Sequence, residues 1–178
     1  AAGAAAVVIA ACNGTPRPRN LLLITLDTMR ADRLPSYGFS GVDTPALDRI
    51  AAEGAVFEQA FASVPLTLPS HASLFTGLYP HRLNLRDNVA PPLAPEFTTM
   101  AEALRDRGLT TGAFVASGVL GPSRGLDQGF VVYNDAVAAG CSSAPRARRP
   151  ANEVGDEALQ WIAEQPTAFF AWVHLYDT

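Results

Sequence analysis

The sequence centres on residues 64–77, which read Val64-Pro65-Leu66-Thr67-Leu68-Pro69-Ser70-His71-Ala72-Ser73-Leu74-Phe75-Thr76-Gly77. Pro69 suits the first position of a helix, and Gly77 is a residue type that commonly ends one. We therefore expect a short helix that starts at Pro69, with Thr67 in the turn just before it. Unpaired backbone N–H groups at such a helix start favour phosphate or sulfate oxygens. The simpler alternative is that Thr67 only caps the helix.

A buried strand is predicted upstream, over the near-continuous apolar run from Asn20 to Leu26. Asp27 follows this run directly. In open α/β sheets, functional residues gather beyond the carboxyl ends of the strands, and a carboxylate is a natural ligand for a hard metal ion. Such a metal ion could convert the Thr67 hydroxyl into a nucleophile.

Strands and helices alternate along the rest of the chain, which predicts an α/β fold: a three-layer, mostly parallel sheet flanked by helices. The expected helices run from Thr44-Pro45 to Gly54, from Thr98/Thr99 to Gly108, and onward from a cap at Asn152. The further strands are expected over Thr110 to Ala116 and, in a central position, over Ala168 to Asp177. Residues 118–129 are read as a loop.

Several motifs in a fixed order resemble the N-terminal part of a sulfatase-type enzyme of the alkaline phosphatase superfamily. They are Leu26-Asp27-Thr28-Met29-Arg30-Ala31-Asp32, Tyr37-Gly38, Thr44-Pro45-Ala46-Leu47-Asp48, Pro65-Leu66-Thr67-Leu68-Pro69-Ser70-His71 and Thr76-Gly77-Leu78-Tyr79-Pro80-His81-Arg82. The resemblance runs from about Asn20 to Thr178.

This resemblance implies an alkaline-phosphatase-like fold and a metal-dependent hydrolase or transferase of small anionic esters. Thr67 holds the nucleophile position, Asp27 and Thr67 would ligate a divalent ion (Ca, Mn or Zn), and His71 would bind the anion or protonate a leaving oxygen. The family's remaining metal ligands would lie beyond Thr178. We therefore expect a C-terminally incomplete catalytic domain over residues 20–178 that is inactive by itself.

The sequence departs from the sulfatase pattern at three positions. Sulfatases carry Cys or Ser, oxidised to formylglycine, where Thr67 stands, and threonine cannot yield that aldehyde. His71 replaces an Arg, and Thr28 replaces a frequent second Asp. Thr67 therefore favours phosphate or phosphonate esters. The alternatives are a catalytically inactive, envelope-tethered binding domain and a true sulfuric ester hydrolase.

Composition indicates a globular domain rather than a disordered chain. The 178 residues are 48% hydrophobic and 17% charged, with a net charge of -4. This charge, without a basic patch, gives no reason to expect nucleic acid as a partner.

The N-terminus resembles the remains of a bacterial lipoprotein signal. Residues 1–12 are apolar and too short to span a bilayer, and Ile9-Ala10-Ala11-Cys12 resembles a lipobox. Residues 13–19 form a Pro-containing linker. We therefore expect an exported protein of the bacterial cell envelope, anchored to the membrane through a lipid on Cys12; a small-residue buried helix is the alternative.

Other polar residues are weaker candidates. Arg30 and Asp32 are expected to pair with each other rather than to contact substrate. Solvated loop positions are the simpler interpretation of three residues beyond the Thr67 helix: His81, Arg82 and Asn88. The same holds for the basic cluster Arg146, Arg148 and Arg149, and Cys141 is expected to be incidental.

Overall fold

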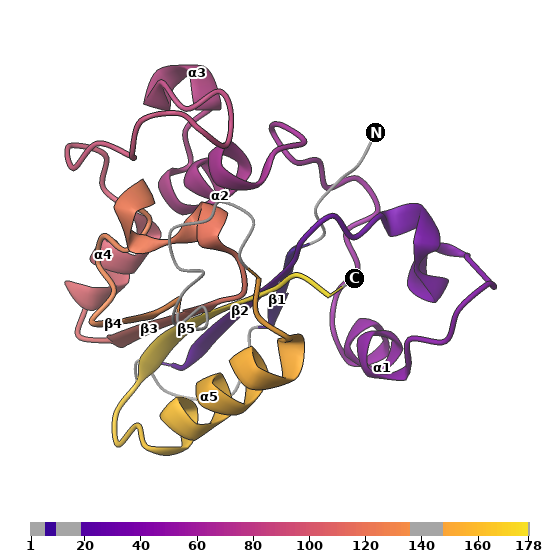
Figure 1. Ribbon diagram of the computed structural model, residues 1–178. Coiled ribbons are helices and arrows are strands. Elements are labelled where there is room, and N and C mark those ends of the chain that lie inside the picture. Colours follow the sequence, from indigo (N-terminus) through magenta and orange to yellow (C-terminus); the bar gives the residue numbers. More distant parts are fainter. Residues whose placement is uncertain (1–5, 10–18, 136–147, 178) are drawn as a thin grey trace.

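The computed structural model describes residues 6–9, 19–135 and 148–177. Its centre is a sheet of order β1-β2-β5-β3-β4 (Figure 1). The strands are β1 (Ala6–Ile9), β2 (Leu21–Leu26), β3 (Thr110–Val115), β4 (Val132–Asn134) and β5 (Phe169–Leu175). All neighbours pair in parallel except β1, which runs antiparallel to β2.

Strand β5 occupies the central position that the sequence predicts for it. It pairs with β2 on one side and β3 on the other, and its residues from Phe169 to His174 are buried. A fully buried strand in a parallel sheet must be apolar on both faces. The run Phe169-Phe170-Ala171-Trp172-Val173 meets this requirement, and it is interrupted at its carboxyl end by the buried His174.

Helices cover both faces of the sheet, as expected for a three-layer fold (Figure 1). One face carries α2 (Thr67–Thr76), α3 (Pro80–Leu83) and α4 (Met100–Arg105), and the other carries α5 (Ala151–Ala163). On the α2 side, Leu68 and Phe75 share a buried cluster with Trp172. On the α5 side, Trp161 packs so closely over Gly112 that a Cβ at Gly112 would lie 2.9 Å from its ring.

Two predicted helix starts differ from the observed ones. Helix α2 begins at Thr67 rather than at Pro69, so Thr67 lies inside the first turn. This is possible because a proline in the first turn forfeits no intrahelical bond. Helix α5 begins at Ala151 after Pro150, and Asn152 lies inside it without capping it. Helix α4 has the expected cap, since Thr99 and Glu102 form a complete capping box.

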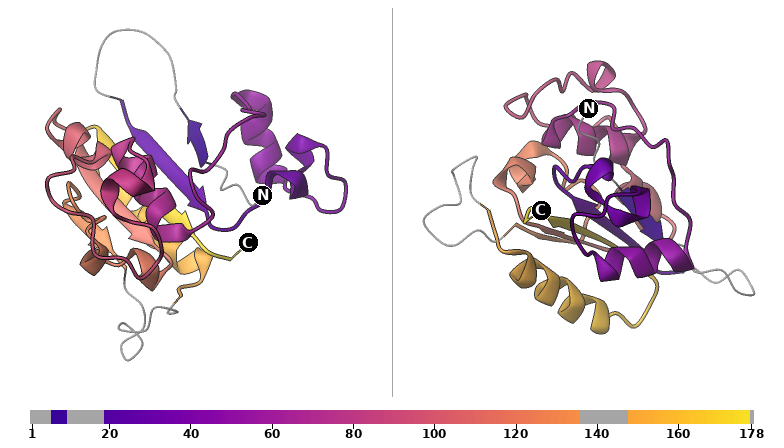
Figure 2. Two further views of the ribbon diagram at one scale, coloured as in Figure 1. Left: turned by 90° about the horizontal axis from the view of Figure 1, so that it is seen from above. Right: turned by 90° about the vertical axis from the view of Figure 1, so that its right-hand side faces the viewer.

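Residues between β2 and α2 form a lobe beside the sheet (Figure 2, left). It contains the 3-10 turns η1 (Ala31–Arg33) and η2 (Pro35–Tyr37) and the helix α1 (Pro45–Glu53). No residue of α1 is buried, and Thr44 donates its hydroxyl to Asp48 instead of capping the helix. The predicted loop 118–129 contains two further 3-10 turns, η3 (Gly118–Leu120) and η4 (Pro122–Arg124).

The N-terminal predictions fall largely outside the described residues. Cys12, Cys141 and residues 13–18 are not among those that the structure describes. Ala6–Ile9, within the predicted signal remnant, form β1. Within the described ranges, no helix combines the length and apolarity needed to cross a bilayer.

Candidate active site

Asp27 stands at the carboxyl end of β2, where the sequence places it. Its backbone N–H donates to the Leu175 carbonyl at 2.9 Å, which extends the pairing of β2 and β5 by one residue. The residue is only 6% exposed. A carboxylate at this depth needs hydrogen-bonding partners, because a buried charge without them is costly.

Thr67 is one of those partners. Its Oγ1 donates a hydrogen bond of 3.1 Å to Asp27 Oδ2. The strand end and the helix start therefore bring together the two residues that the sequence assigns to the metal and the nucleophile, although they lie 40 positions apart.

His174 is a second partner of Asp27. Its Nε2 lies 3.3 Å from Asp27 Oδ2, its side chain is fully buried, and its Nδ1 has no hydrogen-bond partner in the part of the chain that the structure describes. His174 was not predicted from the sequence as a site residue. The signal was present, because a lone polar residue near the end of a buried apolar strand is expected to have a specific partner.

The surroundings keep Asp27 ionised. Burial is the largest single influence and would raise its pKa, but the interactions with His174, His71 and Thr67 together outweigh burial. The pKa of Asp27 therefore lies below its ordinary value. An ionised, buried carboxylate suits cation binding.

His71 lies one turn after Thr67 and is buried among aromatic rings. Its Nδ1 is 2.7 Å from the Thr67 carbonyl oxygen, and its Nε2 is 3.2 Å from Thr25 Oγ1. Burial, helped by the charge of His174, lowers the pKa of His71 to about 4. A role for His71 as anion ligand or proton donor stays a prediction, and these contacts favour positioning of Thr67 instead.

Asn88 occupies the N-terminus of α2. Its Oδ1 accepts from the Leu68 backbone N–H at 2.9 Å, while Ser70 N–H donates to the Leu66 carbonyl and Pro69 has no N–H. Of these first-turn groups, the N–H of Thr67 remains as a donor for an anion. The sequence predicts several such donors, so the anion site at this helix start is smaller than expected. Asn88 is thus a cap supplied from 20 residues away.

The other weak candidates that the structure describes are exposed or have partners of their own. Arg30 and Asp32 form an exposed bidentate pair at 2.8 and 2.6 Å, as expected. His81 and Arg82 are exposed on α3. Arg148 is exposed and stacks on Tyr176, whereas Arg149 is buried and pairs with Glu157. Arg146 falls outside the described residues.

Thr28, in the place of the family's second Asp, has a left-handed backbone with a φ of 57°. A β-branched residue rarely adopts this conformation. Such strain often accompanies functional sites, and Thr28 follows Asp27 directly.

The donor set fits part of a metal site. Asp27 and Thr67 present oxygens 3.1 Å apart, and oxygen is the donor that hard cations prefer. The described residues hold no group of three or more His, Cys, Asp or Glu arranged to bind a metal. Since such cations take about six ligands, Asp27 and Thr67 could supply only some of them.

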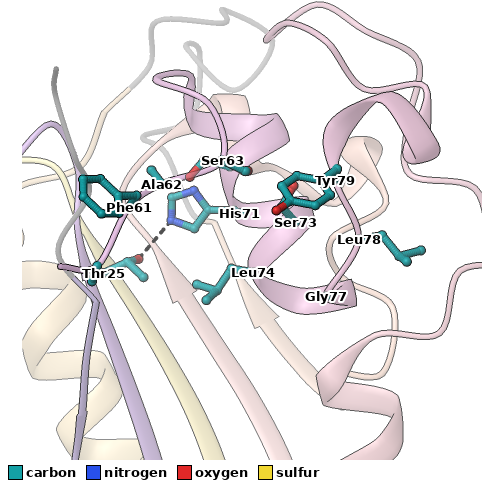
Figure 3. A pocket seen from close by; sticks show the side chains of 12 residues that line it. Thr25, Phe61, Ala62, Ser63, His71, Ser73, Leu74, Gly77, Leu78 and Tyr79 are labelled. Atoms are coloured by element: carbon teal, nitrogen blue, oxygen red, sulfur yellow. Dashed lines mark hydrogen bonds between the residues drawn. The ribbon is translucent and has the colours of Figure 1, made fainter. Parts of the chain in front are cut away.

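A cavity of about 350 Å³ lies beside this site (Figure 3). Its lining includes Thr25, His71, Leu74 and Tyr79, but neither Asp27 nor Thr67. Figure 3 shows His71 at its wall with a hydrogen bond to Thr25. The cavity therefore lies against the side of α2 rather than at the proposed nucleophile.

Comparison with known proteins shows that the chain is similar to sulfatases. Human arylsulfatase A is 37% identical over 111 residues, which cover 60% of this chain and 22% of that protein. Mouse steryl-sulfatase is 38% identical over 106 residues, covering 54% of this chain and 17% of that protein. The chain thus spans about a fifth of the length of these curated relatives.

Solved structures share the fold at low identity. A phosphonate monoester hydrolase of Agrobacterium radiobacter superposes with a TM-score of 0.70 at 24% identity, over 90% of this chain and 41% of that chain. BT4656, solved with its substrate D-glucosamine-2-N,6-O-disulfate, gives a TM-score of 0.74 at 20% identity, and the match covers 89% of this chain and 34% of that chain. The family model for sulfatases matches residues 19–178, and the chain belongs to the sulfatase family.

Proposed function

We propose that this chain is the N-terminal part of a metal-dependent hydrolase or transferase of small anionic esters, with Thr67 as nucleophile. The observation that carries the proposal is the hydrogen bond from Thr67 Oγ1 to Asp27 Oδ2. It lies at the carboxyl edge of a parallel sheet, where α/β enzymes hold their functional groups. Membership of the sulfatase family agrees with ester chemistry.

The residues of this chain would divide the chemistry as follows. Asp27 would hold a divalent cation, with Ca, Mn and Zn all compatible with oxygen donors, and further ligands would come from residues outside the described part. When bound, such a cation lowers the pKa of the hydroxyl and offsets the negative charge of the ester. Thr67 Oγ1, having lost its proton to solvent water, would attack the phosphorus or sulfur, and the bond to the leaving oxygen would break with its electron pair going to that oxygen.

The identity of the nucleophile bears on the substrate. A formylglycine hydrate can expel sulfate through its second hydroxyl, but a sulfated threonine has no such exit. A phosphothreonine can be cleared by attack at phosphorus. Thr67 therefore favours phosphate or phosphonate esters, although the relatives named above carry sulfatase names.

A catalytically inactive binding domain is the second candidate. The specific observation in its favour is that Asn88 uses a first-turn N–H of α2 that an anion would otherwise take. The presence of His71 where sulfatases carry an Arg also favours the inactive binding domain. A true sulfuric ester hydrolase is the third candidate, supported by membership of the sulfatase family and by the names of the relatives.

The test compares aryl phosphate, phosphonate and sulfate esters in the full-length protein with Thr67→Ala, Thr67→Ser and Thr76→Ala. Thr76 is a matched control, since its hydroxyl bonds the Ala72 carbonyl at the other end of α2. We expect Thr67→Ala to abolish turnover, Thr67→Ser to retain part of it, and Thr76→Ala to leave it unchanged. Mass spectrometry of the enzyme during turnover should find a phosphorylated Thr67. Near wild-type kcat in Thr67→Ala removes Thr67 from the mechanism, and preference for sulfate esters restores the third candidate.

We also propose that the full-length protein is exported and tethered to the bacterial envelope through a lipid on Cys12. The support is the sequence Ile9-Ala10-Ala11-Cys12 with its following linker. With a complete signal, the protein should partition with membranes and Cys12→Ala should release it. Equal membrane binding of Cys12→Ala would rule the anchor out.

A further inference from the structure

One threonine hydroxyl joins the sheet to helix α2 behind the proposed nucleophile. Thr25 Oγ1, on β2, lies 3.1 Å from Nε1 of Trp172 on β5 and 3.2 Å from Nε2 of His71 on α2. Trp172 is 0% exposed, and Thr25 and His71 are each 5% exposed. At this depth each polar atom depends on its protein partner.

The chemistry of these groups fixes the direction of each hydrogen bond. An indole N–H can only donate, so Thr25 Oγ1 accepts from Trp172. The Thr25 hydroxyl proton then needs an acceptor, and among the residues that the structure describes His71 Nε2 is the remaining partner of that oxygen. His71 Nε2 therefore lacks a proton, which agrees with the cost of charging a buried ring.

The other ring nitrogen of His71 is fixed by the main chain. A carbonyl oxygen only accepts, so His71 Nδ1 carries the ring proton and donates it to the Thr67 carbonyl at 2.7 Å. The result is one directed series of bonds, from Trp172 to Thr25, from Thr25 to His71, and from His71 to the first turn of α2.

We propose that Thr25 is a positioning residue: its hydroxyl holds the ring of His71 in place through Nε2, and His71 holds the Thr67 main chain through Nδ1, so that the nucleophile stays beside Asp27. This inference rests on the proposed role of Thr67. Thr25 and Asp27 are two positions apart on one strand, so they lie on the same face of the sheet. Strand β2 therefore positions both Asp27 and Thr25, the two residues on which the placement of Thr67 depends. A displacement of about 1 Å at such a site costs up to about 100-fold in rate.

Only a hydroxyl can accept and donate at this position at once. Thr25→Ser keeps both bonds, whereas Thr25→Val keeps the shape but leaves Trp172 Nε1 and His71 Nε2 without partners. Thr111→Val is the matched control, because Thr111 is a buried threonine on β3 whose hydroxyl bonds the Gly129 carbonyl at 2.6 Å. Thr111→Val should lower the free energy of unfolding as Thr25→Val does, but it should leave the contacts of His71 and Thr67 unchanged.

The experiment uses the full-length protein and two readouts. The first is kcat and KM with an aryl phosphate, and the second is the ¹⁵N spectrum of His71, assigned by its loss in His71→Gln. In the wild type and in Thr25→Ser we expect a protonated Nδ1 and a bare Nε2, with near-normal kcat. In Thr25→Val the Thr67 carbonyl still holds the proton on Nδ1, so we expect the same tautomer with a shifted Nε2 resonance, because Nε2 loses its hydrogen bond, and a fall in kcat of about 10- to 100-fold, with little change in KM. Thr111→Val should retain both the wild-type Nε2 resonance and kcat.

The outcomes separate this inference from the proposed function. Normal kcat in Thr25→Val, while Thr67→Ala is inactive, overturns the positioning role alone. A wild-type spectrum with a protonated Nε2 also overturns it, since Thr25 could not then donate to that atom. Turnover by Thr67→Ala defeats the proposed function, and the positioning role with it.

Discussion

The imidazole of His71 is packed against Trp172, with ring centroids 5.5 Å apart, and folding keeps it uncharged. Burial lowers its pKa from 6.5 to about 4. Between these two values the unfolded chain binds a proton at this residue and the folded chain does not. Stability therefore falls as the pH falls through this window.

We expect the contribution of His71 to the free energy of unfolding to drop by roughly 3 kcal/mol from neutral pH to pH 4, since one pKa unit corresponds to about 1.4 kcal/mol. Urea unfolding at a series of pH values measures it. His71→Gln should flatten the dependence between pH 6.5 and 4, whereas the exposed His81→Gln should not. Identical slopes in wild type and His71→Gln would contradict the buried, neutral state.

Thr28 offers a test of backbone strain next to Asp27. Its φ of 57° is unfavourable for a β-branched side chain, whereas asparagine tolerates this conformation. Thr28→Asn should raise the free energy of unfolding by about 1 kcal/mol, measured by urea unfolding. Thr28→Val, which keeps the branch, should bring no gain, and a gain of equal size in both variants would show that the backbone is not the cause.

The starts of the helices show what sequence patterns capture at the level of elements. The start of α4 was predicted at Thr98 or Thr99, and the structure shows a capping box there within four consecutive residues, Thr99 to Glu102. Asn152 and Thr44 fit the same local rule, yet neither side chain caps its helix. The cap of α2 comes from Asn88, after the helix, so a rule that reads only the preceding residues does not find it.

The strands were predictable for a similar reason. Long apolar runs identify β2 and β5. Asp27 follows the run of β2, and His174 lies near the end of the run of β5, and both residues belong to the candidate site. The partnership of Asp27 with His174 depends instead on the parallel register, in which Thr25 is level with His174. Nothing in the sequence gives this register, and so Thr25, Trp172 and His174 were missed while Asp27 and Thr67 were found.

The cap at Asn88 gives a prediction for helix α2. Asn88→Ala removes the acceptor of the Leu68 N–H and should cost about 1 kcal/mol of unfolding free energy. Asn152→Ala removes an exposed asparagine that does not cap its helix, and its effect should stay within about 0.5 kcal/mol. Chemical denaturation of both variants makes the comparison, and equal losses would show that Asn88 is not a cap.

At the scale of the whole molecule, the large apolar side chains that stay exposed are distributed unevenly. Helix α5 covers one face of the sheet, and the lobe of residues 27–64 lies beside the sheet (Figure 2). Around this lobe and α2 the chain exposes large apolar side chains: Phe57, Phe61, Leu66, Leu74, Leu78 and Tyr79. Exposed apolar surface that gathers in one region marks an interaction surface or an aggregation liability.

Self-association of the 178-residue chain should therefore proceed through this region. Phe61 is 85% exposed, and replacing it by Ser should shift the onset of association, measured by light scattering over a concentration series, to higher protein concentration. Leu159→Ser is the control, because Leu159 is 65% exposed but lies on α5, across the sheet. The hydrophobic gain from covering a side chain depends on the area that the contact buries, and an isolated exposed leucine on a polar helix face offers little of it. Equal shifts in Phe61→Ser and Leu159→Ser would mean that association follows total apolar exposure rather than the surface around α2.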